Sequence, residues 1–128
     1  MFPGRWNDAE TPVIYAAEHY STAMLEKLVH NSGVMPPNQH VIQITLPRGI
    51  SFELVTKDTL PSWASEDGAQ SSAFGAAWVQ ARRSLVLIVP SVVARMERNI
   101  IINPAHPKFG QIEVGLPEPI WWDKRLFR

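Results

Sequence analysis

The sequence predicts an α+β fold with a mixed, split β-sheet as its core and helices that flank the sheet. Several short runs rich in β-branched and apolar residues are typical of strands, and two longer segments show helical spacing. The length of 128 residues and the hydrophobic content of 45% suit one domain with one core. We therefore expect a single domain over residues 1–128 that contains every functional residue.

The first half of the chain is predicted to form a strand, a helix and two further strands. Residues 11–16 are a β-branched and aromatic run opened by a proline, which is typical of a strand that leaves a loop. Residues 18–31 place apolar side chains at helical spacing, and Gly33 can cap the end of this helix. After a loop with two prolines, residues 40–46 alternate as a strand does, and residues 50–55 can extend the sheet.

The second half of the chain is predicted to add one helix and three strands. Residues 58–70, rich in Pro, Ser, Gly and acidic residues, are expected to form surface turns, and residues 71–83 to form the helix. The near-continuous apolar run of residues 84–89 predicts a buried strand, which Pro90 ends. Two further short strands are expected at residues 98–102 and 111–114, joined by the turn-forming segment 103–110.

The composition argues against several classes of protein. Lys plus Arg and Asp plus Glu both number 12, so no net charge attracts nucleic acid or anionic lipid. Without cysteine the chain has neither disulfides nor thiolate nucleophiles. Its apolar runs are interrupted well before the ~20 residues of a membrane helix, and the N-terminus lacks the features of a signal peptide. We expect a soluble, cytoplasmic protein that binds neither nucleic acid nor membrane.

Two kinds of ligand motif are missing from the sequence. The four histidines form no H-x-x-x-H pair, so we do not expect a metal site. The sequence also contains neither G-x-G-x-x-G nor a P-loop. Any NAD binding is therefore expected to differ from that of Rossmann folds.

Three segments carry a specific pattern. The first begins with GRWN at residues 4–7 and continues with PVIYAA at 12–17 and MLEKLVH at 24–30. The second, residues 74–93, has a Gly and a Trp before an apolar strand that ends in Pro-Ser. The third, residues 99–109, has an Asn, an apolar run and an NPxHP turn. In order and spacing these segments resemble the RES domain, a family named for its Arg, Glu and Ser.

The resemblance assigns roles to five residues. The family's Arg falls on Arg5, its Glu on Glu26 and its Ser on Ser91, and these are the expected catalytic residues. Tyr15 and Asn103 match two other recurrent polar positions and, with Arg5 and Ser91, are expected to bind the dinucleotide. The resemblance further implies a fold like that of ADP-ribosyltransferases, NAD as substrate without a metal, and a toxin whose antitoxin partner carries an Xre-type helix-turn-helix.

These residue types suit cleavage of the nicotinamide–ribose bond. The reaction passes through an oxocarbenium-like state, which a carboxylate near the ribose and a cation at the pyrophosphate would stabilise. Glu26 and Arg5 are of the right types, since the planar guanidinium matches phosphate oxygens. Ser91 can orient the ribose or a water, but no general base is evident that would make it a nucleophile. Tyr15 would stack on the nicotinamide ring, and Asn103 can donate a hydrogen bond to the ligand.

Each of these residues also has a purely structural alternative. Arg5 can form a surface ion pair, and Glu26 can pair with the histidine four residues later on its helix. Ser91 can be a turn or N-cap serine, and Tyr15 a core residue whose hydroxyl is satisfied. Asn103 can simply shape its turn. Because neither Arg5 nor Glu26 is expected in the core, replacing either with alanine should abolish toxicity and leave the fold intact.

The leading hypothesis is an enzyme that transfers ADP-ribose from NAD to a host protein and so arrests growth. With water or phosphate as acceptor, it would instead be an NAD glycohydrolase or phosphorylase. Family members usually have a leading strand and loop with a basic residue upstream of GRWN, whereas four residues precede Arg5 here. We expect this to open the pocket and favour a macromolecular acceptor. A catalytically inactive nucleotide- or partner-binding module is the alternative from another class, and an RNA-cleaving toxin is disfavoured by the zero net charge.

Overall fold

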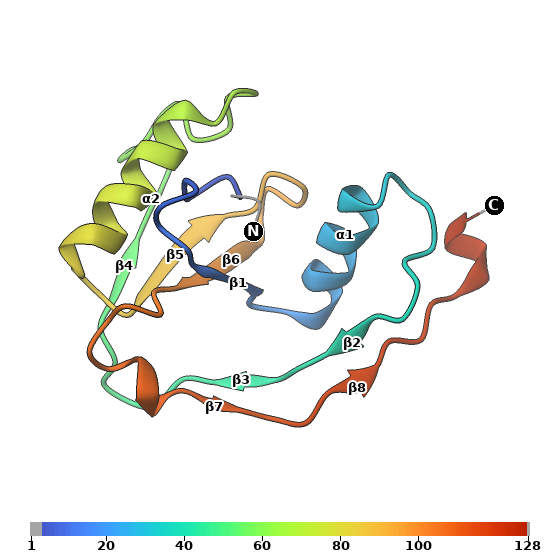
Figure 1. Cartoon of the computed structure of the whole chain (residues 1–128). Helices are drawn as coiled ribbons and strands as arrows, with labels where there is room; N and C mark the ends of the chain where they lie inside the picture. Colours follow the sequence, from blue (N-terminus) through green and yellow to red (C-terminus); the bar gives the residue numbers. More distant parts are fainter. Residues whose placement is uncertain (1–3, 128) are drawn as a thin grey trace.

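The main sheet has four strands in the order β1-β6-β5-β4 (Figure 1). The computed structural model describes residues 4–127. The strands are β1 (Ile14–Ala17), β4 (Phe52–Leu54), β5 (Val86–Pro90) and β6 (Arg98–Ile102). β4 runs parallel to β5, whereas β1 and β5 both run antiparallel to β6. The sheet is therefore mixed, as the sequence predicts, and its two central strands are the most apolar.

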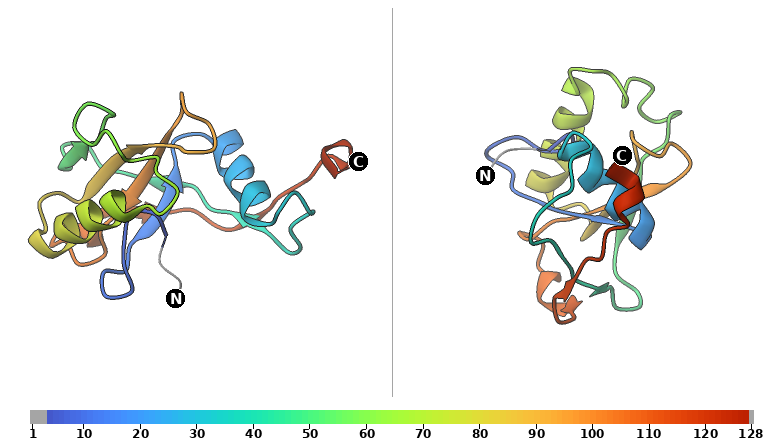
Figure 2. Two further views of the ribbon diagram at one scale, coloured as in Figure 1. Left: turned by 90° about the horizontal axis from the view of Figure 1, so that it is seen from above. Right: turned by 90° about the vertical axis from the view of Figure 1, so that its right-hand side faces the viewer.

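The other strands form two separate ribbons, so the sheet is split. β2 (His40–Val41) pairs with β8 (Glu118–Pro119), and β3 (Ile44–Thr45) pairs with β7 (Glu113–Val114), both antiparallel. The ribbons run one after the other below the main sheet in Figure 1. The views of Figure 2 show that the C-terminal segment extends away from the main sheet.

Two helices lie apart from each other beside the main sheet (Figure 1). α1 (Tyr20–His30) is capped by Asn31 and followed by two residues of positive φ, Ser32 and Gly33, and the Gly33 N–H donates to the Leu28 carbonyl at 2.8 Å. α2 (Ala69–Ala81) begins after Gly68 and ends at Arg82, both in the left-handed conformation. The predicted capping role of Gly33 is thus confirmed in the Gly33–Leu28 hydrogen bond, although the helix itself ends at His30.

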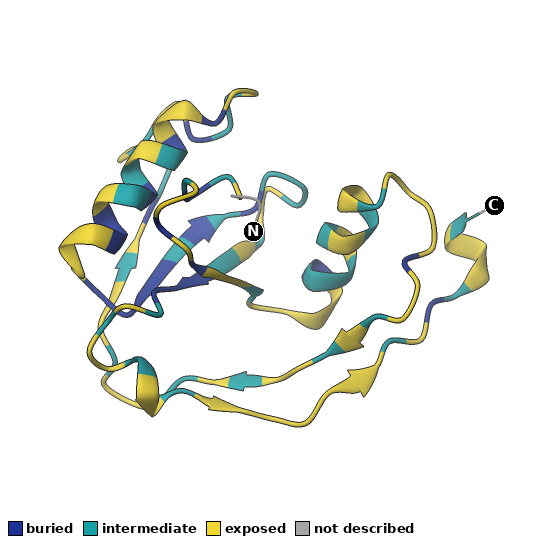
Figure 3. Ribbon diagram, in the orientation of Figure 1, coloured by how far each residue is buried: buried dark blue, intermediate teal, exposed yellow. Residues whose placement is uncertain are grey.

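The side chains of the main sheet alternate between two apolar layers. Residues opposite each other on antiparallel strands share a face. On one face Leu87, Val89 and Ile101 are fully buried in a core with residues of α2 and three tryptophans: Trp6, Trp63 and Trp78. On the other face a smaller cluster includes Val86 and Ile102 with residues of β3 and of the segment before β7. Figure 3 shows the buried residues concentrated on the central strands and the inner side of α2, while the ribbons are largely exposed.

α2 lies unusually close to the N-terminal segment. A Cβ built on Gly75 would lie 1.6 Å from the Trp6 carbonyl oxygen and 2.6 Å from its carbon. Only a residue without a side chain allows the two backbones to approach this closely. The glycine at position 75 therefore fixes the position of the segment that carries Arg5 and Trp6.

Several predicted boundaries were wrong. β1 begins at Ile14 rather than at residue 11, because Thr11 closes a turn by hydrogen bonding to Asp8. α2 starts and ends two residues earlier than residues 71–83. The predicted strand 40–46 is broken into β2 and β3, and residue 111 belongs to a 3-10 turn, η1 (Phe109–Gln111). Neither β8 nor the C-terminal 3-10 turn η2 (Lys124–Phe127) was predicted from the sequence.

Candidate functional site

Glu26 lies at the centre of a small polar cluster between α1 and the main sheet. Its Oε1 accepts a hydrogen bond from the Ser91 hydroxyl at 2.8 Å and another from the Asn99 amide Nδ2 at 3.0 Å. Ser91 follows β5 directly, and Asn99 is the second residue of β6. The partners of Glu26 among the described residues are thus polar groups of the sheet rather than His30 on its own helix.

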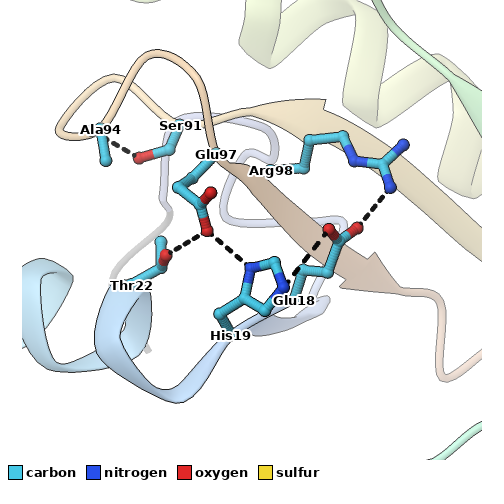
Figure 4. A network of polar contacts seen from close by, with 7 residues as sticks. All are labelled: Glu18, His19, Thr22, Ser91, Ala94, Glu97 and Arg98. Atoms are coloured by element: carbon cyan, nitrogen blue, oxygen red, sulfur yellow. Dashed lines mark hydrogen bonds and ion pairs between the residues drawn. The ribbon is translucent and has the colours of Figure 1, made fainter.

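A polar network holds α1 in the orientation that brings Glu26 to the sheet (Figure 4). Thr22, one turn before Glu26 on the same face of the helix, donates to Glu97 at 2.9 Å. His19 Nδ1 contacts the same Glu97 oxygen at 2.6 Å, and Arg98 forms an ion pair with Glu18. The Thr22 hydroxyl, and then the His19 ring, keep the pKa of the Glu97 carboxyl below its ordinary value of 4.5. These contacts connect the start of α1 to the loop between β5 and β6.

Ser91 is fully buried and makes three hydrogen bonds. Its N–H donates to the Glu97 carbonyl at 3.0 Å, and its hydroxyl oxygen accepts from the Ala94 N–H at 3.0 Å while the hydroxyl proton goes to Glu26. It therefore combines the turn role with a contact to the carboxylate. No general base for Ser91 was evident in the sequence, and in the structure its hydroxyl donates to the Glu26 carboxylate. Both hydrogen bonds of the hydroxyl are to protein groups, so Ser91 positions the Glu26 carboxylate, and it is not proposed as a nucleophile.

Arg5 is attached to backbone rather than to a surface carboxylate. Its Nη1 donates to the carbonyls of Trp63 at 3.1 Å and Ser65 at 2.8 Å. Within residues 4–127, the other guanidinium nitrogens, Nε and Nη2, have no hydrogen-bond partner. Arg5 thus connects the N-terminal segment to the turns before α2 and keeps donors available for a ligand.

Tyr15 is held by its hydroxyl while part of its ring is exposed. The hydroxyl donates to the Asn7 side-chain oxygen at 2.6 Å and accepts from the Trp6 N–H at 3.0 Å. Burial of the hydroxyl raises the pKa of Tyr15 to about 12, so the phenol is neutral at physiological pH. Because 44% of the residue is exposed, the ring has a free surface, and the neutral hydroxyl cannot act as a base.

Asn103 lies at the other end of the sheet. It is fully buried, its Nδ2 donates to the Val79 carbonyl at 3.1 Å, and its Oδ1 accepts from the Ala105 N–H at 2.9 Å. Its N–H bonds to Leu85 at the start of β5, whereas Ser91 follows the end of that strand. At about 3.4 Å per strand residue, Asn103 and Ser91 are roughly 20 Å apart.

The structure thus brings together some, but not all, of the predicted residues. Glu26 and Ser91 are in contact, and Tyr15 shares a sheet face with Asn99 because the pairs Tyr15↔Ile101 and Ala17↔Asn99 are in register. Diagonal neighbours of this kind have Cα atoms about 7–8 Å apart. Arg5 precedes Trp6, which is bonded to Tyr15. The geometry of Asn103 matches its structural alternative, and its role in ligand binding remains a prediction.

Asn99 is the residue that the sequence analysis missed. It donates to Glu26, but its own Oδ1 is buried and has no hydrogen-bond partner among the described residues. The available signal was a polar residue at the start of an otherwise apolar strand, within the Asn-initiated third segment of the family pattern. The site around Glu26 therefore has three members from α1, β5 and β6.

The other surface features lie away from this cluster. A depression of about 420 Å³ is lined by residues 35–40 and 119–122 with Lys124, and none of the five predicted site residues borders it. Within residues 4–127 no group of three or more His, Asp or Glu side chains is placed to hold a metal ion. No helix in this part of the chain is long and apolar enough to cross a membrane.

Comparison with known proteins identifies the family. The chain is 38% identical to the "Prs ADP-ribosylating toxin" of a Sphingobium species, over 98% of this chain and 81% of that protein. It is 33% identical to "Toxin Res" of Yersinia enterocolitica, over 84% of this chain and 72% of the relative. For "Toxin Res" of Pseudomonas putida the identity is 31%, over 97% and 86% of the two chains. The family model described as RES domain matches residues 1–123, and the chain therefore belongs to the RES domain family.

Proposed function

We propose that this protein is the toxin of a toxin–antitoxin pair, which binds NAD, breaks its nicotinamide–ribose bond and transfers ADP-ribose to a host protein. The anchored carboxylate of Glu26 carries this proposal. The names of the relatives support the general activity, since one is called an ADP-ribosylating toxin and two others Toxin Res.

Glu26 is oriented for a reaction at the ribose. Ser91 and Asn99 both donate to Oε1, which leaves Oε2 without a partner among the described residues. In the reaction the C–N bond breaks and its electron pair leaves with nicotinamide, so positive charge develops on the ribose. A fixed carboxylate beside that charge lowers the barrier, and it can also accept the proton that the attacking group loses.

Arg5 and Tyr15 fit the two ends of the nicotinamide half of NAD. The guanidinium is held by two carbonyls and still has unused donors, which can bind pyrophosphate oxygens without first being ordered. The partly exposed ring of Tyr15 can stack on nicotinamide, and its bonded hydroxyl keeps the ring from rotating away. The roles are therefore phosphate binding for Arg5, ring stacking for Tyr15 and electrostatic stabilisation for Glu26.

The proposal also includes the acceptor of ADP-ribose and the antitoxin partner. A protein side chain as acceptor makes the enzyme a mono-ADP-ribosyltransferase, and water or phosphate would make it an NAD-degrading enzyme. The proposed antitoxin has an Xre-type helix-turn-helix, so this chain itself requires no nucleic-acid surface, in agreement with its net charge of zero. We place its action in the cytoplasm, where NAD and a host protein target are both present.

The test follows the fate of NAD labelled in its adenylate half. The purified chain is incubated with labelled NAD, with and without cell lysate, beside Glu26→Gln and the control Glu113→Gln, which changes an exposed carboxylate on β7. We expect label on a lysate protein with the wild type and the control, and at least a 100-fold lower rate with Glu26→Gln.

The other outcomes separate the alternatives. Free ADP-ribose, or its phosphate, without labelled protein would identify a glycohydrolase or phosphorylase. NAD that stays intact while the protein binds it would indicate a catalytically inactive module. If Glu26→Gln were as active as the wild type, the assignment of the site would be wrong.

A further inference from the structure

Asn99 contains the one buried acceptor in this cluster that the protein leaves unsatisfied. Its Nδ2 donates to Glu26 Oε1 at 3.0 Å, whereas its Oδ1 is buried and has no partner within residues 4–127. An unpaired buried carbonyl costs about 1–3 kcal/mol, so native proteins rarely keep one without a reason. A ligand that supplies a donor at this point would recover that free energy.

The orientation of the Asn99 amide is determined by its neighbour. Rotating the amide would direct its oxygen at the Glu26 carboxylate and lose the hydrogen bond, so the nitrogen must face Oε1. The missing partner must therefore be a donor, an O–H or an N–H group. Phosphate oxygens only accept hydrogen bonds, which excludes the pyrophosphate of a dinucleotide from this position.

A second acceptor, on Glu26, limits which ligand group can bind beside Asn99. Oε2 of Glu26 is also without a partner among the described residues, and the planar Asn99 amide lies directly beside the carboxylate. Two acceptors on side chains that are hydrogen-bonded to each other can meet two neighbouring donors, and the vicinal hydroxyls of a ribose provide such a pair. We infer that Asn99 Oδ1 binds one hydroxyl of the ribose attached to nicotinamide, while Glu26 binds the other; this inference rests on the proposed function.

The Asn99 oxygen must become accessible before a ligand can contact it. The atom is covered, although Asn99 and Glu26 are each partly exposed, so the cluster lies just beneath the surface. Hydrogen bonds at catalytic sites commonly reach their final geometry only when the ligand is bound. In the complex the sugar hydroxyl contacts this oxygen, and the contact makes Asn99 selective for a sugar that carries the hydroxyl.

The experiment measures affinities for NAD and for two analogues that lack the 2′- or the 3′-hydroxyl of the nicotinamide ribose. The quench of tryptophan fluorescence after rapid mixing gives Kd before turnover. The proteins are the wild type, Asn99→Ala and the control Asn31→Ala, whose side chain bonds only the nearby Val34 carbonyl within residues 4–127. Circular dichroism and the melting temperature establish that each variant is folded.

We expect the wild type to lose about three- to tenfold in affinity for one of the two analogues. Asn99→Ala should bind NAD correspondingly more weakly and show no further loss with that analogue, because the partner of the hydroxyl is already absent. The control should behave as the wild type does.

The inference would be overturned if the loss of affinity caused by Asn99→Ala and the loss caused by the missing hydroxyl were additive. A residue that merely supports the fold weakens the binding of every ligand equally. A third analogue, in which the carboxamide of NAD is replaced by a carboxylate, provides a further check. If Asn99→Ala loses its discrimination against this analogue alone, the contact of Asn99 is to the carboxamide and the inference is wrong. If the wild type neither binds nor cleaves NAD, the proposed function itself fails.

Discussion

Replacing Gly75 with alanine tests the closest backbone contact in the structure. The added carbon would lie 1.6 Å from the Trp6 carbonyl oxygen, and real contacts are essentially never under 3.0 Å, so the two backbones must separate by at least about 1.4 Å. Overpacking of this kind costs about 1–3 kcal/mol. Helix propensity acts in the opposite direction, because alanine is favoured over glycine by up to about 1 kcal/mol.

The net result should be destabilisation by about 1–2 kcal/mol, which lowers the melting temperature by roughly 4–10 °C for a chain of this length. The matched control is Gly110→Ala, where an added Cβ meets nothing within 4 Å and the change should stay within about 0.5 kcal/mol. Calorimetry of both variants provides the measurement. A Gly75→Ala protein as stable as the wild type, or more stable, would refute the reasoning, because helix propensity would then outweigh the contact with Trp6.

Three further predictions concern residues around the site. Arg5→Ala should lose about 1–3 kcal/mol of stability as well as activity, since Arg5 is bonded to two carbonyls; urea titration would contradict this if the midpoint did not move. The folded pKa of Tyr15, about 12, exceeds its ordinary 10.0, so its contribution to stability is complete below pH 10 and is lost as the pH rises to 12. Between pH 9 and 12 the free energy of unfolding should therefore change less steeply with pH in Tyr15→Phe than in the wild type. Equal slopes in the two proteins would contradict this prediction. Asn103→Ala should cost about 2–3 kcal/mol through its two lost hydrogen bonds, and an unchanged urea midpoint would contradict this. Fluorescence titration of the folded fraction with NAD tests the predicted binding role separately: weaker affinity would support it, and unchanged affinity would leave only the structural role.

The contacts of Arg5 add a stability effect to what is expected of its alanine variant. The sequence placed this residue outside the core and predicted that alanine there would leave the fold intact. Its two hydrogen bonds to the carbonyls of Trp63 and Ser65 span 58 and 60 residues along the chain, so no local pattern could indicate them. Loss of activity in Arg5→Ala must therefore be judged against loss of stability, whereas Glu26→Gln gives the cleaner test of the site.

Strand pairing likewise depends on contacts between distant segments that no local pattern indicates. The apolar pattern predicted both ends of β6, residues 98–102, correctly, and its last two side chains are buried. The alternating segment 40–46 is equally strand-like by pattern, but it pairs with residues of β7 and β8 rather than with the main sheet. Partner choice depends on which distant segments the fold brings alongside, so the two short ribbons could not be foreseen.

The sequence by itself determined the class of fold, most of the helices and strands, the family, and the identity of Glu26 and Ser91 as residues of interest. These properties depend on local periodicity and on a specific order of residues along the chain. Only the tertiary structure decided which polar groups meet: it joined Glu26 to Ser91 and Asn99 across 65 and 73 residues, and it buried Asn103 at the far end of the sheet. The physical reason is that hydrogen bonds act over about 3 Å in space, whatever the distance along the chain.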